Sequence, residues 1–414
     1  MKQITEFPYK RHTLKNGIRL VHRSTLSEVS HCAITINVGQ RDEKDDENGI
    51  AHFIEHCIFK GTKKRKFFHI LNSIDGVGGE LNAFTTKEET CIYATFLNRY
   101  YPKVLDLFSD IVFNSCFPQK ELDKEKLVVL DEINSYEDTP SELIYDDFDN
   151  LVFDNHPLGK YILGSKKSVE SFNSDKLKDF VKRNYKTSSM VISTIGSIDF
   201  SKWVLLCEKF FGDIITDNTP IRRRNFKGYS PKDKIIKRDT SQVHLILGNI
   251  AFGYKSKYRI PFSLLNNIVG GGAMNSRLNM HIREKYGFTY CLESSYTSYF
   301  DTGLFTVYAA TDKEKIDKTL KLIEDELDVF CNKTISPSAL KKAKEQLIGQ
   351  LFIQYENNQN EVISMGKSIL NYDRIDSLKT TQKVIEQISE KDIKEVAQKV
   401  FQKDMYSYLR YINN

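Results

Sequence analysis

The same order of predicted elements occurs twice in this 414-residue chain, about two hundred residues apart. In the first half, a strand at 90–97 is followed by an amphipathic helix, a proline and a second helix at 119–136. In the second half, a strand at 303–310 is followed by a helix whose apolar residues recur every three or four positions. Ser336-Pro337, a favourable helix start, then introduces another helix. This repeat predicts two domains of one topology.

The ends of the two halves also correspond. Ser174 begins a predicted helix that leads to a strand at 189–195. Ser389 begins a predicted helix that leads to a strand at 405–412. Each half therefore closes with a helix followed by a strand, which supports the repeat.

Each half also begins with predicted strands, at 17–23 and 31–38 in the first and at 242–250 in the second. Strands combined with paired helices favour layers of sheet and helix, and hence an α/β protein. A polar stretch that includes three successive arginines connects the halves. We predict a first domain at 1–215, a linker at 216–234 and a second domain at 235–414.

One predicted helix of the first half carries three polar side chains in an otherwise apolar run, His52-Phe-Ile-Glu55-His56. Asn48 is expected to cap this helix and Gly61 to end it. Residues at i, i+3 and i+4 share one face of a helix, so the three side chains converge. Burying them without partners costs free energy. A divalent metal bound by the two histidines, with Glu55 beside it as proton acceptor, removes that cost.

The alternative for this helix is a pair of core histidines that are hydrogen-bonded to a glutamate. The order H-x-x-E-H is the reverse of the zinc-peptidase motif H-E-x-x-H and is known as the inverzincin signature. The second half contains no such motif. We therefore predict one metal site in each chain.

A catalytic zinc ion usually has three protein ligands and a water molecule, so two histidines are too few. The helix at 119–136 places Glu125, Val128, Val129 and Glu132 on one stripe. Carboxylates that share a stripe with valines are unusual for solvated charges. We predict Glu132 as the third ligand and Glu125, two turns earlier, as a residue that supports a ligand. A solvated surface position remains the alternative for either glutamate.

A second segment with candidate residues runs from Gly270 to Tyr290. Its three glycines resemble a phosphate-binding loop, but no Gly-Lys-Ser/Thr follows them, which argues against nucleotide binding. Arg277, Arg283 and Tyr290 carry donors that can reach a peptide carbonyl. The residue chemistry does not choose between Arg277 and Arg283.

Composition excludes several classes of function. The net charge is +5, and the basic runs at 60–66 and 222–224 are expected to be solvated surface without a nucleic-acid partner. No apolar run reaches the roughly 18 residues of a membrane span, and the N-terminus lacks the apolar core of a secretory signal. The seven cysteines contain no C-x-x-C pair and are expected to be reduced core residues. A cytoplasmic protein without membrane contact is expected.

With these residues assigned, nearly the whole chain resembles the pitrilysin/insulinase family of zinc metallopeptidases, and most closely its short branch of mitochondrial-processing-peptidase type. The matching segments are 49–62, 78–93, 128–133, 156–164 and 275–290. The resemblance implies that Glu125 supports a zinc ligand and that Arg283 and Tyr290 assist catalysis. It also implies that peptides add as a strand to the edge at 81–84, where Asn82, Ala83 and Phe84 bind substrate.

The fold that we expect is α/β, of the α+β type, with two homologous domains. Each domain is a mainly antiparallel sheet packed with helices, and the chain forms half of a clamshell. The implied function is a zinc-dependent endopeptidase with one Zn²⁺ per chain that hydrolyses short or unfolded peptides in a closed chamber. A homodimer with shared active sites is the expected assembly. The alternative is a catalytically silent assembly subunit, but such relatives lose zinc ligands, which this chain retains.

Overall fold

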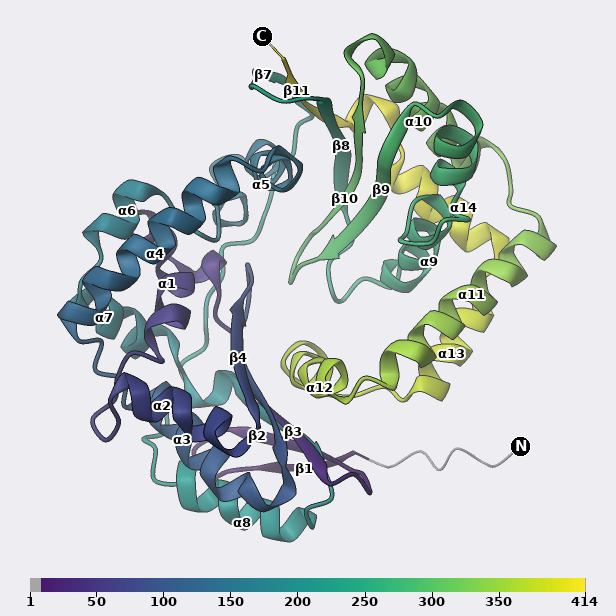
Figure 1. Cartoon of the computed structure of the whole chain (residues 1–414). Helices are drawn as coiled ribbons and strands as arrows, with labels where there is room; N and C mark the ends of the chain where they lie inside the picture. The colour runs from purple at the N-terminus through teal and green to yellow at the C-terminus, as the bar shows by residue number, and fades with distance from the viewer. Residues whose placement is uncertain (1–8, 414) are drawn as a thin grey trace. The chain divides into compact units, whose positions relative to one another are not determined.

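The structure is a computed structural model that describes residues 9–413, apart from the side chain of Tyr290. It contains two β-sheets, each packed with helices, which confirms the predicted α/β class (Figure 1). The residues divide into two compact units, each with its own sheet. The first unit comprises 9–134, 160–224 and 354–375, and the second comprises 135–159, 225–353 and 376–413.

The first unit contains a sheet of six strands in the order β1-β2-β6-β3-β5-β4. Strands β2 and β6 pair in parallel, and the other neighbours are antiparallel. The strands are β1 (Lys10–Thr13), β2 (Arg19–Ser24), β3 (Val29–Ile36), β4 (Glu80–Thr85), β5 (Thr90–Leu97) and β6 (Met190–Gly196).

The second unit contains a sheet of five strands in the order β7-β11-β8-β10-β9. Strands β7 and β11 pair in parallel, and the other neighbours are antiparallel. Without β1, the first sheet has the same order and the same strand directions, so the two domains share one topology, as the repeat predicted. The strands are β7 (Asp233–Lys237), β8 (Val243–Ala251), β9 (Thr289–Ser298), β10 (Gly303–Thr311) and β11 (Ser407–Ile412).

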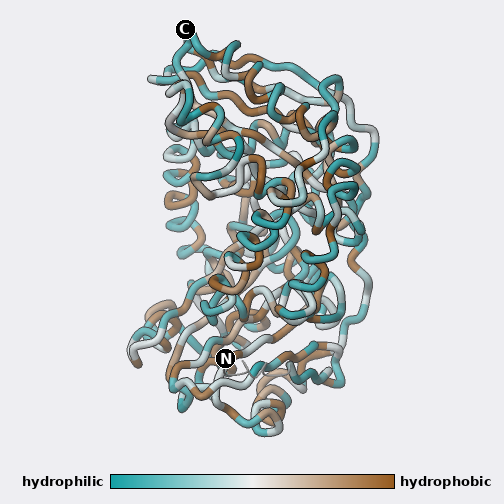
Figure 2. Tube along the Cα trace, turned by 90° about the vertical axis from the view of Figure 1, so that its right-hand side faces the viewer, coloured by the Kyte–Doolittle hydropathy of each residue, from teal (hydrophilic) through white to brown (hydrophobic). Residues whose placement is uncertain are grey.

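The helices pack apolar faces onto the sheets, and hydrophobic and hydrophilic residues alternate along their traces (Figure 2). The first unit holds α1 (Ile50–Cys57), α2 (Phe67–Ile74), α3 (Tyr101–Phe113), most of α4 (Gln119–Glu137), α6 (Lys166–Ser171), α7 (Ser174–Asn184), α8 (Phe200–Phe211) and α12 (Asn358–Tyr372). The second unit holds α5 (Pro140–Val152), α9 (Arg259–Val269), the π-helix η7 (Asn279–Glu284), α10 (Ile316–Asn332), most of α11 (Pro337–Tyr355), α13 (Leu378–Gln387) and α14 (Glu390–Val400).

One helix from each half of the sequence packs in the unit of the other half. Helix α12 lies against β3 and β6 of the first sheet, where its Val362 and Met365 share a core with Ala33 of β3. Gly366 allows the close approach, because a Cβ there would lie 2.3 Å from the Thr35 hydroxyl oxygen. The sequence did not predict this arrangement.

The converse holds for α5, which follows α4 in the first half of the sequence. It lies against β8 and β11 of the second sheet, and its Ile144 and Phe148 share a core with Ile246 and Leu409. The compact units therefore do not follow the predicted division at 1–215 and 235–414 for these two helices.

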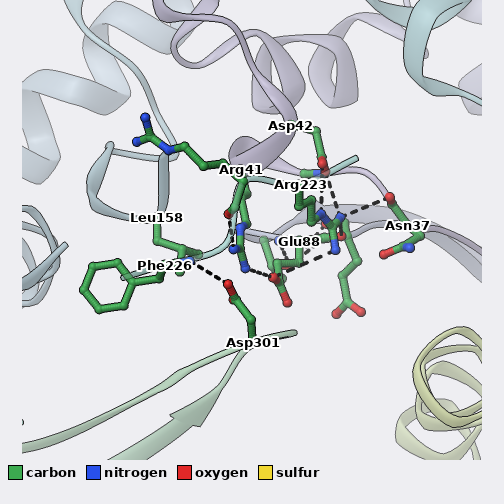
Figure 3. Close-up of polar contacts among 12 residues, drawn as sticks. Asn37, Arg41, Asp42, Glu88, Leu158, Arg223, Phe226 and Asp301 are labelled. Carbon is green, nitrogen blue, oxygen red and sulfur yellow. Dashed lines mark hydrogen bonds and ion pairs between the residues drawn. The ribbon is translucent and has the colours of Figure 1, made fainter. Parts of the chain in front are cut away.

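The predicted linker is attached to the first unit by one of its arginines. Arg223 pairs with Asp42 at 2.8 Å and donates to the Glu88 carbonyl at 2.6 Å (Figure 3). Arg41 in turn pairs with the Glu88 carboxylate at 2.6 Å. The Arg223 side chain is 7% exposed, so the prediction of a solvated basic run is wrong at this residue.

Two further predictions concern membrane-spanning segments and the cysteines. Within residues 9–413, no helix is long and apolar enough to cross a bilayer. All seven cysteines are free, as expected. Four are buried, but Cys291 is exposed, which corrects the expectation of a core position for that residue.

Candidate metal centre

Helix α1 carries the H-x-x-E-H motif in the first unit. It starts after Gly49, whose φ of 92° favours glycine, and ends at Cys57. The expected ends are therefore wrong, because Asn48 provides no cap and the helix stops before Gly61. Phe53 and Ile54 are fully buried in the core. Burial of this apolar face directs the motif residues away from the core.

The start of α1 is held by a residue that the sequence did not reveal. Glu43 accepts the backbone N–H groups of Gly49 at 2.9 Å and Ala51 at 3.0 Å, and the Asn48 amide at 3.3 Å. Burial raises the pKa of Glu43, and the N–H donors, which bind both oxygens of its carboxylate form, oppose this rise. A carboxylate from the preceding loop thus replaces the predicted Asn48 cap.

His52, His56 and Glu132 come together as a group that can hold a metal ion, with ligand atoms within 4.8 Å of one another. The Nε2 atoms of the two histidines are 3.3 Å apart. Glu132 of α4 lies 3.8 Å from His52 Nε2 and 3.6 Å from His56 Nε2. Two imidazole nitrogens and one carboxylate are the donors that catalytic zinc takes.

One buried polar atom without a partner at this group also fits a metal-bound water. The Glu55 Oε2 atom is buried and has no hydrogen-bond partner among the described residues. A buried carboxylate oxygen without a donor carries a free-energy cost, which a metal-bound water can remove by donating to it.

Glu125 of α4 supports His56 and is itself supported. Its Oε1 lies 2.9 Å from His56 Nδ1, so the imidazole donates there and turns Nε2 toward Glu132 and His52. Its Oε2 lies 2.6 Å from Lys60 Nζ. Glu125 is buried, whereas Val128 and Glu132 of the same predicted stripe are exposed.

The electrostatics of the group follow from burial and these contacts. Burial, assisted by His56, lowers the pKa of His52 to about 3, which keeps this imidazole neutral and able to bind a metal. Burial raises the pKa of Glu55. Burial would also raise the pKa of Glu125, but the hydrogen bonds from His56 and Lys60 outweigh it and lower that pKa.

The predicted substrate residues Asn82, Ala83 and Phe84 lie on β4, which packs beside α1. Strand β4 ends the sheet order, and among the described strands it pairs with β5 alone. The Asn82 side-chain oxygen accepts the backbone N–H of Ala83 at 2.9 Å. The open side of an edge strand offers main-chain groups to an added strand.

The candidates of the second half lie in the second unit, where the side chains of Arg277 and Arg283 have different partners. Arg283 belongs to the π-helix η7, and its Nη1 contacts the Met274 sulfur at 3.2 Å. Arg277 instead pairs with Glu326 at 2.8 Å, which also accepts from His281. The backbone of Tyr290 is part of β9, but its side chain lies outside the described residues. Of the two candidate arginines, Arg283 is thus the one without a carboxylate partner among the described residues.

Two family models match this chain. Residues 19–166 match the insulinase model (peptidase family M16), and residues 171–347 match the peptidase M16 inactive domain. The uncharacterized zinc protease YmxG of Bacillus subtilis is 34% identical over 405 residues, which cover 95% of this chain and 96% of that protein. An uncharacterized zinc protease of Rickettsia bellii is 33% identical over 405 residues, with 97% of each chain covered.

Solved structures show the same fold. A protease from Helicobacter pylori matches with a TM-score of 0.92 at 21% identity, over 98% of this chain and 99% of that one. A peptidase M16 inactive domain from Pseudomonas fluorescens matches with a TM-score of 0.92 at 19% identity, over 98% of each chain. With relatives above 30% identity along nearly their full length, the chain belongs to the insulinase family of peptidases, family M16.

Proposed function

We propose that this protein is a zinc-dependent endopeptidase that hydrolyses short or unfolded peptides. The observation that carries the proposal is the group of His52, His56 and Glu132 beside Glu55, whose buried Oε2 has no partner among the described residues. Two imidazoles and one carboxylate leave a fourth position for water, as in catalytic zinc sites. One zinc ion per chain is expected. A zinc ion bound there supplies a Lewis acid and an acidified water.

Each side chain then has one task. His52 and His56 present Nε2, and Glu132 presents its carboxylate, to the ion. Glu125 keeps His56 in the tautomer that frees Nε2, because it accepts the Nδ1 proton. Glu55 takes the proton of the attacking water and passes it to the leaving amine. The raised pKa of Glu55 supports this role, since a base is most effective when its pKa is near the working pH.

Substrate is proposed to bind as an added strand on β4. Asn82, Ala83 and Phe84 would contact it, with the Ala83 N–H exchanging its Asn82 acceptor for a peptide carbonyl. Main-chain pairing of this kind gives affinity with a loose sequence preference. It also requires an extended peptide, so stable folded proteins should resist cleavage.

The remaining proposals concern assembly and location. We propose a cytoplasmic homodimer that closes a chamber around peptides, with Arg283 and Tyr290 of one subunit serving the zinc site of the other. We also propose a peptidase domain at 1–215 and a second domain at 235–414, on the basis of the two sequence repeats. What supports the dimer is the family resemblance, together with both motifs lying in one chain.

The decisive experiment measures zinc content and peptide cleavage together. The expected result is about one zinc per chain and cutting of an unstructured peptide mixture that a chelator abolishes and zinc restores. A stable globular protein should remain intact. Mass spectrometry of the cut sites would give the cleavage preference, and a zinc-loaded chain that cuts no peptide would contradict the proposal.

The shared site has its own test. Inactive Glu55→Gln and inactive Arg283→Ala chains are mixed under conditions that exchange subunits. Half of the dimers are then mixed, and each has one intact site of two, so roughly a quarter of wild-type activity should return. No recovery, with exchange confirmed independently, would show that each site is built within one chain.

A catalytically silent assembly subunit is the second candidate. It is favoured by the match of residues 171–347 to a model named as an inactive domain. That match covers the half without H-x-x-E-H, whereas the insulinase model covers the half that contains it. Chelator-sensitive cleavage would exclude the silent subunit.

A further inference from the structure

Lys60 lies three residues beyond the end of α1 and points its ammonium group at Glu125. The Nζ atom is 2.6 Å from Glu125 Oε2, within strong charge-assisted hydrogen-bond range. The Lys60 side chain is 19% exposed and that of Glu125 is 7% exposed. A lysine directed inward at a buried carboxylate is unusual for a surface loop, since most lysines extend into water.

The two oxygens of Glu125 have different partners. Oε1 faces His56 Nδ1 at 2.9 Å, and Oε2 faces Lys60 Nζ. A carboxylate held at both oxygens cannot rotate without losing one of the bonds. The ammonium thus fixes the plane of the carboxylate, and the carboxylate fixes the ring of His56.

The position of Lys60 is itself fixed by its surroundings. Its Nζ lies 4.8 Å from the centre of the Phe67 ring, at cation–π distance. The loop that follows is tied to α3 through Asp110, which accepts from Thr62 at 2.6 Å and from Arg65 at 2.5 Å. The ammonium group therefore belongs to a built contact and not to a free surface side chain.

We propose that Lys60 is a positioning residue of the metal centre, which acts through Glu125 to hold His56 in its metal-binding orientation. The inference rests on the proposed zinc site and extends it by one layer. Removing the ammonium would leave the buried Glu125 carboxylate with only the neutral His56 imidazole as its hydrogen-bond partner, and breaking a buried ion pair in this way is costly. The loss of a partner that directly contacts a metal ligand, as Glu125 does, typically weakens metal affinity 10- to 100-fold, and Lys60 acts through that partner.

The experiment measures the zinc dissociation constant of the full chain by competition with a chromogenic chelator. Lys60→Met should weaken zinc binding by about 10-fold or more. Lys60→Arg keeps the charge and the donors and should stay within about 3-fold of wild type. The matched control is Lys63→Met, an exposed lysine of the same loop, which should bind zinc like wild type. The absorption spectrum of the cobalt-substituted protein should change in Lys60→Met alone.

A double-mutant cycle shows whether Lys60 acts through Glu125. In a Glu125→Gln background, Lys60→Met should weaken zinc binding further by no more than about 3-fold, because its partner is already removed. Unchanged affinity in Lys60→Met, or a full additional loss in the Glu125→Gln background, would overturn the assignment. If Lys60→Met does not fold, as judged by the fluorescence of Trp203, Lys60→Gln replaces it with the same expectations.

The outcome is separable from that of the proposed function. Zinc binding is measured without substrate, so a chain that binds zinc and cuts no peptide contradicts the peptidase function and leaves the Lys60 assignment standing. A wild-type chain that binds no zinc contradicts both.

Discussion

Helices α1 and α9 occupy corresponding places in the strand and helix order of the two units. Helix α1 lies between β3 and β4 in the chain, and α9 lies between the corresponding strands β8 and β9. Both bury apolar side chains, Phe53 and Ile54 in α1, and Phe262 and Leu265 in α9. The fold therefore requires an apolar helix at this position, and its polar residues are free to differ.

The difference between the two helices lies in those polar residues. In α1 they are Glu55 and the two histidines, and the histidines lie with Glu132 in the candidate metal group. In α9, the Asn266 side chain accepts from Ser294 at 2.8 Å, a bond that fastens the helix to β9. The following long helices differ in the same way, since α4 buries Glu125 whereas the buried residue of α11 is Leu340. One topology thus carries a group of candidate metal ligands in the first unit, whereas no such group occurs among the described residues of the second.

The largest difference between substitutions in α1 and in α9 is expected at Glu55. Glu55→Gln should keep zinc and the fold but lower kcat by about 10²- to 10⁴-fold, because an amide cannot accept the proton of the water. Ser263→Ala on α9 is the control and should leave activity unchanged. Substantial cleavage by zinc-loaded Glu55→Gln would remove Glu55 from the mechanism.

The next effect separates the two acids of α4. Glu132→Ala removes a ligand and should lose zinc on dialysis, whereas Glu125→Ala should weaken binding by about 10- to 100-fold. Glu345→Ala on α11 is the matched control in the second unit and should bind zinc normally. Full zinc occupancy in Glu132→Ala would mean that the third ligand is another residue.

Metal removal should affect the two units unequally. The ligands connect α1 with α4, so a chelator should speed amide hydrogen exchange in these helices by about 10-fold or more. Exchange in α9 and α11 should not change. Mass spectrometry of the exchanged peptides measures both pairs at once, and equal acceleration in all four helices would show that the metal stabilises the whole chain.

Glu43→Gln tests the side-chain cap that Glu43 provides at the start of α1. Glutamine offers one acceptor oxygen where Glu43 uses two, so its amide would face an N–H donor and the first unit should lose about 1–3 kcal/mol of unfolding free energy. Trp203, the single tryptophan, is buried in this unit, and its fluorescence follows urea unfolding there. An unchanged midpoint would show that the cap contributes nothing.

The smallest effect is expected at the start of α14 in the second unit, which has a local cap. Ser389 accepts the N–H of Asp392 at 3.2 Å, and Asp392 accepts the N–H of Ser389 at 2.8 Å. Ser389→Ala should cost about 1 kcal/mol. Faster amide exchange confined to α14, with an unshifted Trp203 transition, is the expected signature.

Local patterns in the sequence were sufficient for much of the fold. The predicted strand at 90–97 coincides with β5, and the helix predicted at 119–136 is α4, one residue longer. Ser389 begins its helix as expected. Such elements depend on periodicity and capping among neighbouring residues, which a single sequence displays.

The missed features depend on side-chain contacts that the spacing of apolar residues does not report. Neither Glu43 nor Lys60 carries a sequence signal for its role. Glu43 lies in the loop before α1 and accepts its first N–H groups, and Lys60 contacts Glu125 of α4. The wrong Asn48 cap has the same origin, since the Glu43 carboxylate already holds the N–H groups at the start of α1. The exchange of α5 and α12 is likewise invisible to periodicity, which reports that a helix has an apolar face but not which sheet covers it.

The packing of α12 in the first unit affects the order in which that unit can fold during synthesis. The strands and other helices of the first unit are complete in the chain by Phe211, but α12 does not begin until Asn358. At roughly 5–20 residues per second, a ribosome needs about 7 to 30 s to reach it. During that time the apolar face formed by Val21, Ala33 and Val191 has no covering helix. The core of the first unit therefore closes only after α12 has been synthesised.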